Sequence, residues 1–239
     1  MPINLNSNEL NSLGVKLLND RELITTGLVY YWDAGIANSY PGSGSSWYDL
    51  SGNGRTVTLY NGPTYSTTTG GQLSFDGSDD YGLMTTFNLG NGPTPWTISA
   101  WVRTGTSADG LGAGSILSNS SGGPVYSSLC VNAGRIAYWS YSGGWFRLIG
   151  GSITVNNNLW QHLTWVNRSN TTMDMYVNGV KDLSAGSSPS GNNNPIDIIG
   201  GSWAGRFAGI IANTIVYNTA FTDAQVIQNF AAQRVRFGR

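Results

Sequence analysis

The sequence predicts an all-β fold, a two-sheet antiparallel sandwich with a short N-terminal arm and one C-terminal helix. From residue 27 onward, about eleven short runs rich in β-branched and aromatic residues alternate with Gly, Asn, Ser and Pro. Residues 222–235 instead show a helical pattern, and residues 1–26 differ from the rest in composition. A chain of 239 residues is long enough for one large sandwich of this kind.

The run WTISAWV, residues 96–102, shows the alternation expected of a strand. Trp96, Ile98 and the other even-numbered residues fall on one side, and Thr97, Ser99 and Trp101 on the other. Further along, Asn178-Gly179 in YVNGV is a strong signal for a two-residue hairpin turn. These signals favour short antiparallel strands, so we expect one β domain over 27–239.

The arm, residues 1–26, contains both glutamates of the chain and many of its leucines. Asn6 followed by Glu9 has the spacing of a helix capping box, which favours a short helix. The alternative is a mobile tail, the usual state of chain ends. The leucines expected to attach the arm to another protein are Leu10, Leu13, Leu17 and Leu18.

The C-terminal pattern predicts one amphipathic helix over 222–235. Thr222 and Gln225 have the spacing of a capping box, and Arg234 and Arg236 follow near the expected C-terminus, where basic residues favour the helix dipole. The residues expected on its apolar side are Val226, Ile227, Phe230 and Ala231.

Composition excludes several classes of function. Charged residues make up 10% of the chain, against about 25% in typical soluble domains. The net charge of −1 gives no basic surface for nucleic acid, and no apolar run approaches the ~20 residues that span a bilayer. A single cysteine, Cys130, and a single histidine, His162, rule out a disulfide framework and a Cys/His zinc cage. We therefore expect no nucleic-acid or membrane partner.

Six motifs in order resemble one family: GLVYYWDAG, SWYDLSGNG, LSFDGSDDYG, WTISAWVR, WQHLTWV with MYVNGV, and GIIANTIVYNTAFTDAQVIQNF. Together they are similar to the LamG-like, concanavalin A-like jelly roll, whose superfamily includes laminin G modules, pentraxins and legume lectins. SYPGSGSSWYDLSGNG and the ending NFAAQRVRFG resemble LamG-like proteins of tailed bacteriophages, which are mostly virion components.

The resemblance implies a non-enzymatic structural protein of a phage virion: a capsid decoration, fibre or appendage held by its arm. Its partners would be other virion proteins or sister subunits in an oligomer or larger assembly. MPINLNSNEL lacks the charged and apolar regions of a signal peptide, so we expect synthesis in the host cytoplasm and a place in the virion. The alternative function is a carbohydrate-binding, lectin-like adhesion module that binds surface glycans, with or without calcium.

Three acidic residues, Asp76, Asp79 and Asp80, fall within five positions between two strand-like runs. With Gly77 and Ser78 beside them, a hairpin turn is the favoured interpretation. Calcium is the alternative cofactor, since relatives in the resembled superfamily often bind it through loop Asp and Asn, but these residues alone give no full set of six to eight oxygens. We expect no other cofactor.

Catalysis finds little support in the sequence. The glycoside hydrolases that this fold resembles carry E-x-D-x-x-E on one strand, but no glutamate follows residue 22 here. Asp174 is a lone carboxylate on its strand, although two carboxylates from separate loops stay open as an alternative. His162 is expected to be structural, and Cys130 a small buried residue. We therefore expect no enzyme.

A glycan site needs an exposed aromatic ring with polar groups beside it. Trp145 in YSGGWF and Trp203 in GGSWAGRF are flanked by glycines, unlike the tryptophans in strand-like runs. Tyr141 and Arg206 lie close to them in sequence and complete the predicted surface. The alternative is that these rings cover the ends of the sandwich or pack against neighbouring subunits.

Overall fold

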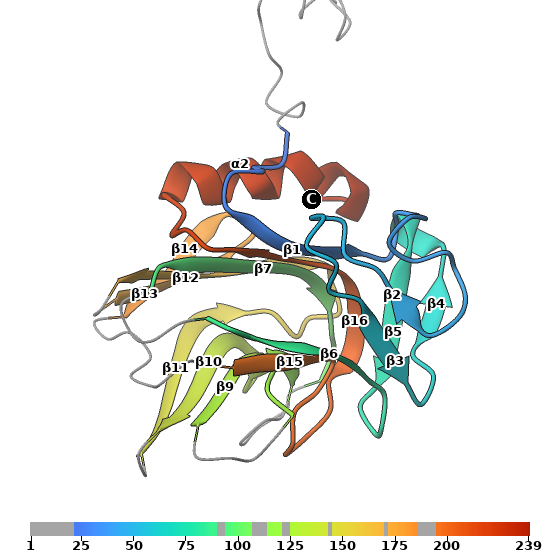
Figure 1. Cartoon of the computed structure of the whole chain (residues 1–239). Coiled ribbons are helices and arrows are strands. Elements are labelled where there is room, and N and C mark those ends of the chain that lie inside the picture. The colour runs from blue at the N-terminus through green and yellow to red at the C-terminus, as the bar shows by residue number, and fades with distance from the viewer. Residues whose placement is uncertain are drawn as a thin grey trace, which may run out of the picture.

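The chain forms two eight-stranded antiparallel sheets packed face to face, in a computed structural model that describes residues 22–89, 94–106, 114–120, 125–142, 145–169, 172–185 and 195–239 (Figure 1). The first sheet, sheet A, has the order β14 (Val180–Ala185), β13 (Thr172–Val177), β12 (Gln161–Ser169), β7 (Trp96–Arg103), β16 (Ala208–Tyr217), β5 (Gln72–Asp76), β4 (Thr64–Ser66), with β1 (Leu28–Asp33) also beside β16. The second, sheet B, has the order β11 (Trp145–Thr154), β10 (Arg135–Ser142), β9 (Val125–Asn132), β8 (Ser115–Ser118), β15 (Pro195–Ile199), β6 (Tyr81–Asn88), β3 (Val57–Tyr60), β2 (Ser46–Trp47).

The predicted fold class is confirmed, but the described residues hold sixteen strands instead of about eleven. One reason is that the run 128–141 is a hairpin, turning at Ala133 and Gly134, which have φ angles of 49° and 73°. The other is that β2 and β4 contain two and three residues, too few to show any periodicity. Their pairing depends on the neighbouring strand and not on their own sequence.

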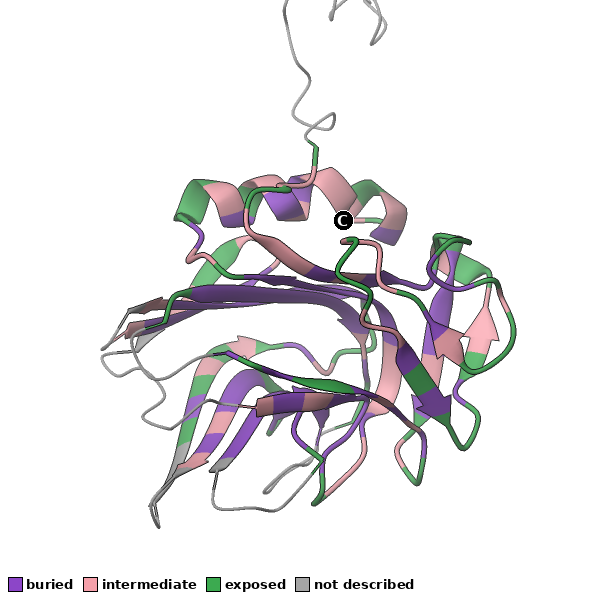
Figure 2. Cartoon of the chain, viewed as in Figure 1, coloured by how far each residue is buried: buried purple, intermediate pink, exposed green. Residues whose placement is uncertain are grey.

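Tryptophans fill the space between the sheets. Trp32, Trp47, Trp96 and Trp165 are all buried there, and Trp96 lies 6.3 Å from the ring of Tyr138 on the opposite sheet. The predicted alternation of 96–102 is confirmed, because its even-numbered residues belong to this core. The odd-numbered side is buried as well, since a helix covers that face of sheet A (Figure 2).

That helix is α2, Asp223–Gln233, followed by a 3-10 turn, η2, Arg234–Phe237. The predicted capping box is present: the Thr222 hydroxyl accepts from the Gln225 amide, and the Gln225 side chain accepts from the Thr222 amide. Val226 and Ala231 are buried as expected, but Ile227 is 46% exposed, so the prediction for Ile227 was wrong. Among the described residues, no helix has the length and apolar character needed to cross a membrane.

Residues 22–26 run along α2 before the first strand (Figure 1). The Ile24 amide donates to Asn229 Oδ1 at 3.0 Å, and Gln228 Nε2 donates to the Glu22 carbonyl at 3.0 Å. Leu23 and Ile24 pack beside Val226 in a small apolar cluster. The leucines predicted to attach the arm, Leu10, Leu13, Leu17 and Leu18, lie outside the described residues, and the arm boundary stays a prediction.

An ion pair between the half-buried Arg236 and a buried carboxylate fastens the C-terminus to sheet A. Arg236 follows the helix and donates to both oxygens of Asp33 on β1, at 2.7 and 2.8 Å. It also donates to the Thr69 and Gly71 carbonyls. The role predicted for Arg236 at the helix dipole is thus replaced by a direct contact with a carboxylate that is 2% exposed.

Replacing Arg236 by Met is expected to cost about 1.5–3 kcal/mol of unfolding free energy, because Asp33 would keep a buried carboxylate without its cation, although Tyr31, Gly35 and Asn213 would still donate to it. Chemical denaturation measures the loss. The double variant Asp33→Asn/Arg236→Met should recover a large part of it by removing that charge. Equal unfolding midpoints for the single and double variants would show that the charge of Asp33 is not the cause.

His162 is buried between sheet A and α2. Its ring lies 5.1 Å from Trp101 and 5.9 Å from Phe230, and Nδ1 is 3.4 Å from the Thr164 hydroxyl. Nε2 has no hydrogen-bond partner among the described residues. Burial therefore lowers the pKa of His162 from 6.5 to about 3, which keeps the ring neutral in the folded protein.

This burial predicts a loss of stability in acid. Because the unfolded chain takes up the His162 proton first, stability falls as the pH drops from 6.5 toward 3, by about 2 kcal/mol at pH 5. Denaturation curves at pH 7 and pH 5 measure the effect. The variant His162→Leu should show a shallower pH dependence; an unchanged dependence would mean that His162 titrates normally in the fold.

Candidate functional site

The two sheets differ in what covers their outer faces. On sheet A, α2 and η2 close the outer face, where Trp101 stacks on Phe237 at 4.1 Å. On sheet B, no described helix covers the outer face, and exposed residues appear along β6 and β11 (Figure 2). The site that the fold leaves accessible is therefore on sheet B.

Cross-strand partners in a sheet share a face, so the register identifies the side chains on the outer face of sheet B. One row of cross-strand partners runs through Leu148, Trp139, Ser128, Ser118, Ile198, Leu83 and Thr58. The strand neighbours of these residues, such as Tyr138 and Leu129, belong to the core, so the row itself points away from the core.

The loop between β15 and β16 folds back over the middle of this face. The Ser118 hydroxyl donates to the Gly201 carbonyl at 2.6 Å. Within the loop, the Ser202 hydroxyl accepts from the amides of Ala204 and Gly205, both at 3.1 Å, and Arg206 Nη1 donates to the Ser202 carbonyl. These bonds give the loop a defined shape on top of the sheet.

Trp203, at the tip of this loop, is 49% exposed. Its ring meets the buried ring of Tyr126 edge-on, at 6.3 Å and 88°. Burial raises the pKa of Tyr126, and the hydroxyls of Ser202, Ser128 and Ser115 partly offset this effect. A large indole thus stands on a buried aromatic base, with much of its surface in contact with solvent.

A second group of rings lies on the same face toward the far edge of the sheet. Tyr60 and Tyr81 are cross-strand partners, stacked at 5.1 Å with 11° between their planes. The Arg206 guanidinium lies 4.6 Å from the centre of the Tyr81 ring. The loop that carries Trp203 is therefore anchored to these tyrosines.

The structure brings most of the predicted surface together. Tyr141 is the cross-strand partner of Tyr126, the residue under Trp203, and Arg206 closes the same loop. Trp145 begins β11 opposite Ser142, and its side chain lies outside the described part. We call the full set the aromatic band: Trp139, Tyr141, Trp203, Tyr81 and Tyr60, with Arg206 stacked on Tyr81.

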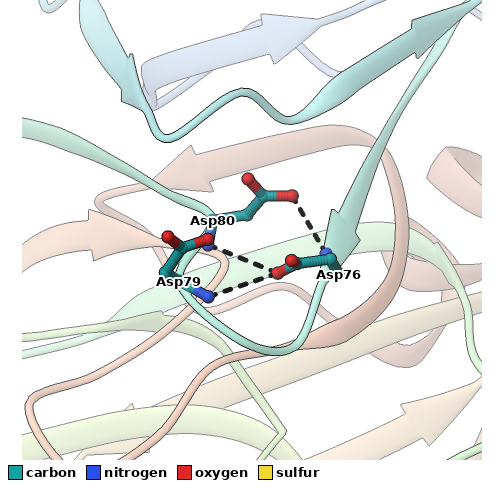
Figure 3. Close-up of side chains that lie close together, drawn as sticks. All are labelled: Asp76, Asp79 and Asp80. Atoms are coloured by element: carbon teal, nitrogen blue, oxygen red, sulfur yellow. Dashed lines mark hydrogen bonds between the residues drawn. The ribbon is translucent and has the colours of Figure 1, made fainter.

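The acidic cluster forms the turn from β5 to β6 (Figure 3). Oδ1 of Asp76 accepts from the amides of Ser78, Asp79 and Asp80 at 2.8, 3.2 and 3.4 Å. Asp80 Oδ2 accepts from the Asp76 amide at 3.0 Å. The amide bonds to Asp76, that of Ser78 foremost, lower its pKa, whereas burial raises that of Asp80.

Comparison with known proteins identifies the family. Residues 76–227 match the sequence profile Laminin_G_3, described as the concanavalin A-like lectin/glucanases superfamily. The chain belongs to this superfamily. No curated protein sequence matches the chain.

Several solved structures have the same fold. Domain 4 of AbnA, an extracellular arabinanase of Geobacillus stearothermophilus solved with arabinotriose, is 19% identical with a TM-score of 0.64, over 85% of this chain and 98% of that one. The receptor-binding domain of botulinum neurotoxin C/D mosaic serotype is 13% identical with a TM-score of 0.67, over 90% of this chain and 55% of that one. The binding domain of Paraclostridial Mosquitocidal Protein 1 is 18% identical with a TM-score of 0.62, over 90% of this chain and 52% of that one. This chain thus spans about half the length of the toxin domains.

In this superfamily member, the carboxylates of Asp76 and Asp80 accept hydrogen bonds that hold the turn from β5 to β6. Ligand oxygens of Asp76, Asp79 and Asp80 lie within 4.8 Å of one another, so the geometry brings together the residues predicted for calcium. One of these oxygens already accepts three amides, and three carboxylates are fewer than the six to eight oxygens that calcium takes. Calcium binding stays a prediction.

Asp174, predicted as a lone carboxylate, lies in an ion-pair network beside the start of α2. Arg168 contacts both Asp174 and Asp223, and Lys181 Nζ lies 3.2 Å from Asp174 and 3.1 Å from Asp223. The Tyr176 hydroxyl, with Lys181 next, lowers the pKa of Asp223. This pair of carboxylates therefore faces two cations, and the lowered pKa of Asp223 does not suit that residue to act as a proton donor.

The turn predicts unequal effects of two neighbouring substitutions. Asp76→Ala removes the acceptor of three amides and is expected to lower the melting temperature clearly, whereas Asp79→Ala, whose carboxylate has no such role, should lower it much less. Thermal unfolding with calcium and with chelator measures both. If instead the two variants lost the same calcium-dependent stabilisation, the cluster would be a cation site and not only a turn.

Proposed function

We propose that this protein is a non-enzymatic carbohydrate-binding module of the lectin type, with its binding surface on the outer face of sheet B. The observation that carries the proposal is Trp203, a half-exposed indole supported by the buried Tyr126 ring, on the loop that covers the middle of this face. Sugar rings have apolar faces that stack on aromatic side chains, and their hydroxyls bond to nearby polar groups.

The comparisons support the kind of ligand that we propose, a sugar-containing molecule. The AbnA domain was solved with arabinotriose, and the structure of a botulinum neurotoxin type C domain, 13% identical with a TM-score of 0.63, concerns interaction with two gangliosides. Arabinotriose and gangliosides both contain sugar units. At these identities the likeness concerns the fold, so the sugar bound by this chain follows from its own surface.

The non-enzymatic part rests on the carboxylates. Hydrolysis of a glycosidic bond needs two carboxyl groups, one of them protonated, on either side of the bond. Asp174 and Asp223 are ion-paired with Arg168 and Lys181, and Asp76 is bonded to its own turn. None of these groups lies in the aromatic band.

The virion role predicted from the sequence stays a prediction. It depends on the leucines of the arm, which lie outside the described residues, and neither the fold nor the comparisons bear on it. A decoration or fibre protein of a phage particle can carry a glycan-binding surface, so the two roles are compatible. Placement in the virion and contact with other virion proteins or sister subunits stay predictions on the same ground.

A glycan array with the full chain and the variant Trp203→Ala tests the proposal. Wild-type protein should bind at least one class of glycan, and Trp203→Ala should weaken that binding at least tenfold, since roughly 1.4 kcal/mol of stacking corresponds to a factor of ten. Ile227→Ala is the matched control, because Ile227 on α2 is 46% exposed and lies on the opposite side of the sandwich. No binding to any glycan, or equal losses for both variants, would reject the proposal.

A further inference from the structure

We infer that the ligand is an uncharged glycan chain of several sugar units that lies across the strands of sheet B along the aromatic band. This inference rests on the proposed function and goes further, since it assigns the charge, the minimum length and the direction of the ligand. Three features of the band lead to it: its extent, the contacts that hold the loop of Trp203, and its low content of charge.

The extent of the band argues for a chain. Its rings come from β10 at one end and β3 at the other, which are separated by five strand-to-strand steps. At about 4.8 Å for each step, the band covers about 24 Å, much more than one sugar ring can contact. Trp139 and Tyr141 mark the first end, and Tyr60, which is 41% exposed, marks the other.

Strand pairing, the loop of Trp203 and two ring contacts connect the band from Tyr141 to Tyr60. Tyr141 pairs with Tyr126, Tyr126 supports Trp203, and the loop of Trp203 continues into Arg206. Arg206 then lies on Tyr81, which is stacked on Tyr60. Because Tyr126 supports Trp203 and Arg206 ties the loop to Tyr81, the central part of the surface is already formed before a ligand arrives, and little ordering would oppose binding there.

The charges of this region argue for a neutral ligand. Arg206 is the one charged member of the band, and its guanidinium is engaged with the Ser202 carbonyl and the Tyr81 ring. Asp197 on β15 accepts from the amide and hydroxyl of Ser120, at 2.5 and 2.9 Å. Arg135 is exposed on the same face of β10, four residues from Trp139 and beyond the end of the band. Within the band, stacking surface therefore predominates over cations that could pair with a uronate, sulfate or sialate.

Tyr60 provides the sharpest test, because it lies at the far end of the band from Trp139. A short oligosaccharide centred on Trp203 would not reach Tyr60, but a longer chain would. The inference therefore predicts that Tyr60→Ala weakens only the binding of long ligands, whereas Trp203→Ala weakens the binding of short and long ligands alike.

The experiment uses the full chain and affinity electrophoresis in gels that contain arabinan, xylan, mixed-linkage β-glucan, polygalacturonate or heparin. We expect retardation by at least one neutral polymer, unchanged by 0.5 M NaCl, and none by the two polyanions. Calorimetry with fragments of the retarding polymer, from the disaccharide to the hexasaccharide, should show affinity rising with length. Tyr60→Ala should lower the affinity for the hexasaccharide roughly tenfold and leave the affinity for the disaccharide unchanged. Tyr60→Phe should behave as wild type, and Ile227→Ala is again the control.

The outcomes separate this inference from the proposed function. Three results would overturn the inference and leave glycan binding intact. They are salt-sensitive binding of a polyanion, an affinity that does not rise with the length of the ligand, and a Tyr60→Ala variant that binds like wild type. Binding on the array only to single sugars or disaccharides, with no polymer retarded, would also overturn it. Absence of binding to every glycan would reject the proposed function and this inference together.

Discussion

The burial of the outer face of sheet A beneath the C-terminal helix decides what the rest of the molecule can do. Trp101 points away from the inner core and stacks on Phe237 and Phe230, and the ion pair of Arg236 with Asp33 holds the chain end in place. One face of the sandwich is thereby closed by the chain itself. Any ligand that uses a sheet face must then approach sheet B.

The edge of sheet B at β11 is partly blocked, which makes it less suitable for a ligand. Asp182 on β14 accepts from the amides of Ser152 and Ile153 on β11, with distances between 2.9 and 3.1 Å. Unpaired amides on an edge strand invite another strand to bind, and a carboxylate placed over them removes that opportunity. The side-chain surface of sheet B is therefore favoured over backbone pairing at this edge.

The sequence was sufficient to predict the fold class and the helix, because both depend on local signals. The alternation in 96–102 and the capping box at Thr222 each act within a few residues. The burial of Trp101 and the exposure of Ile227 depend on which face of the helix meets the sheet, and that is a tertiary contact. Short strands such as β2 also owe their existence to pairing with another strand and not to their own two residues.

The candidate site was predictable only in part, for the same reason. Glycines around Trp203 indicated an exposed ring, and Tyr141 and Arg206 were close enough in sequence to be grouped with it. Tyr60 and Tyr81 were missed, since their stacking arises from the pairing of β3 with β6. Alternation in TVTLY could have placed Tyr60 on the outer face, because Val57 and Leu59 are apolar, but it could not have revealed its partner.

In the proposed glycan surface, Arg206 serves as a support for the loop and not as a free charge. Its guanidinium is engaged with the Ser202 carbonyl and the Tyr81 ring, so it fixes the loop that presents Trp203. A loop that is already ordered loses little conformational entropy when a ligand stacks on it, and stacking contacts of modest strength then yield measurable affinity. Arg206, which the sequence analysis included in the predicted surface, thus contributes by holding the Trp203 ring in position.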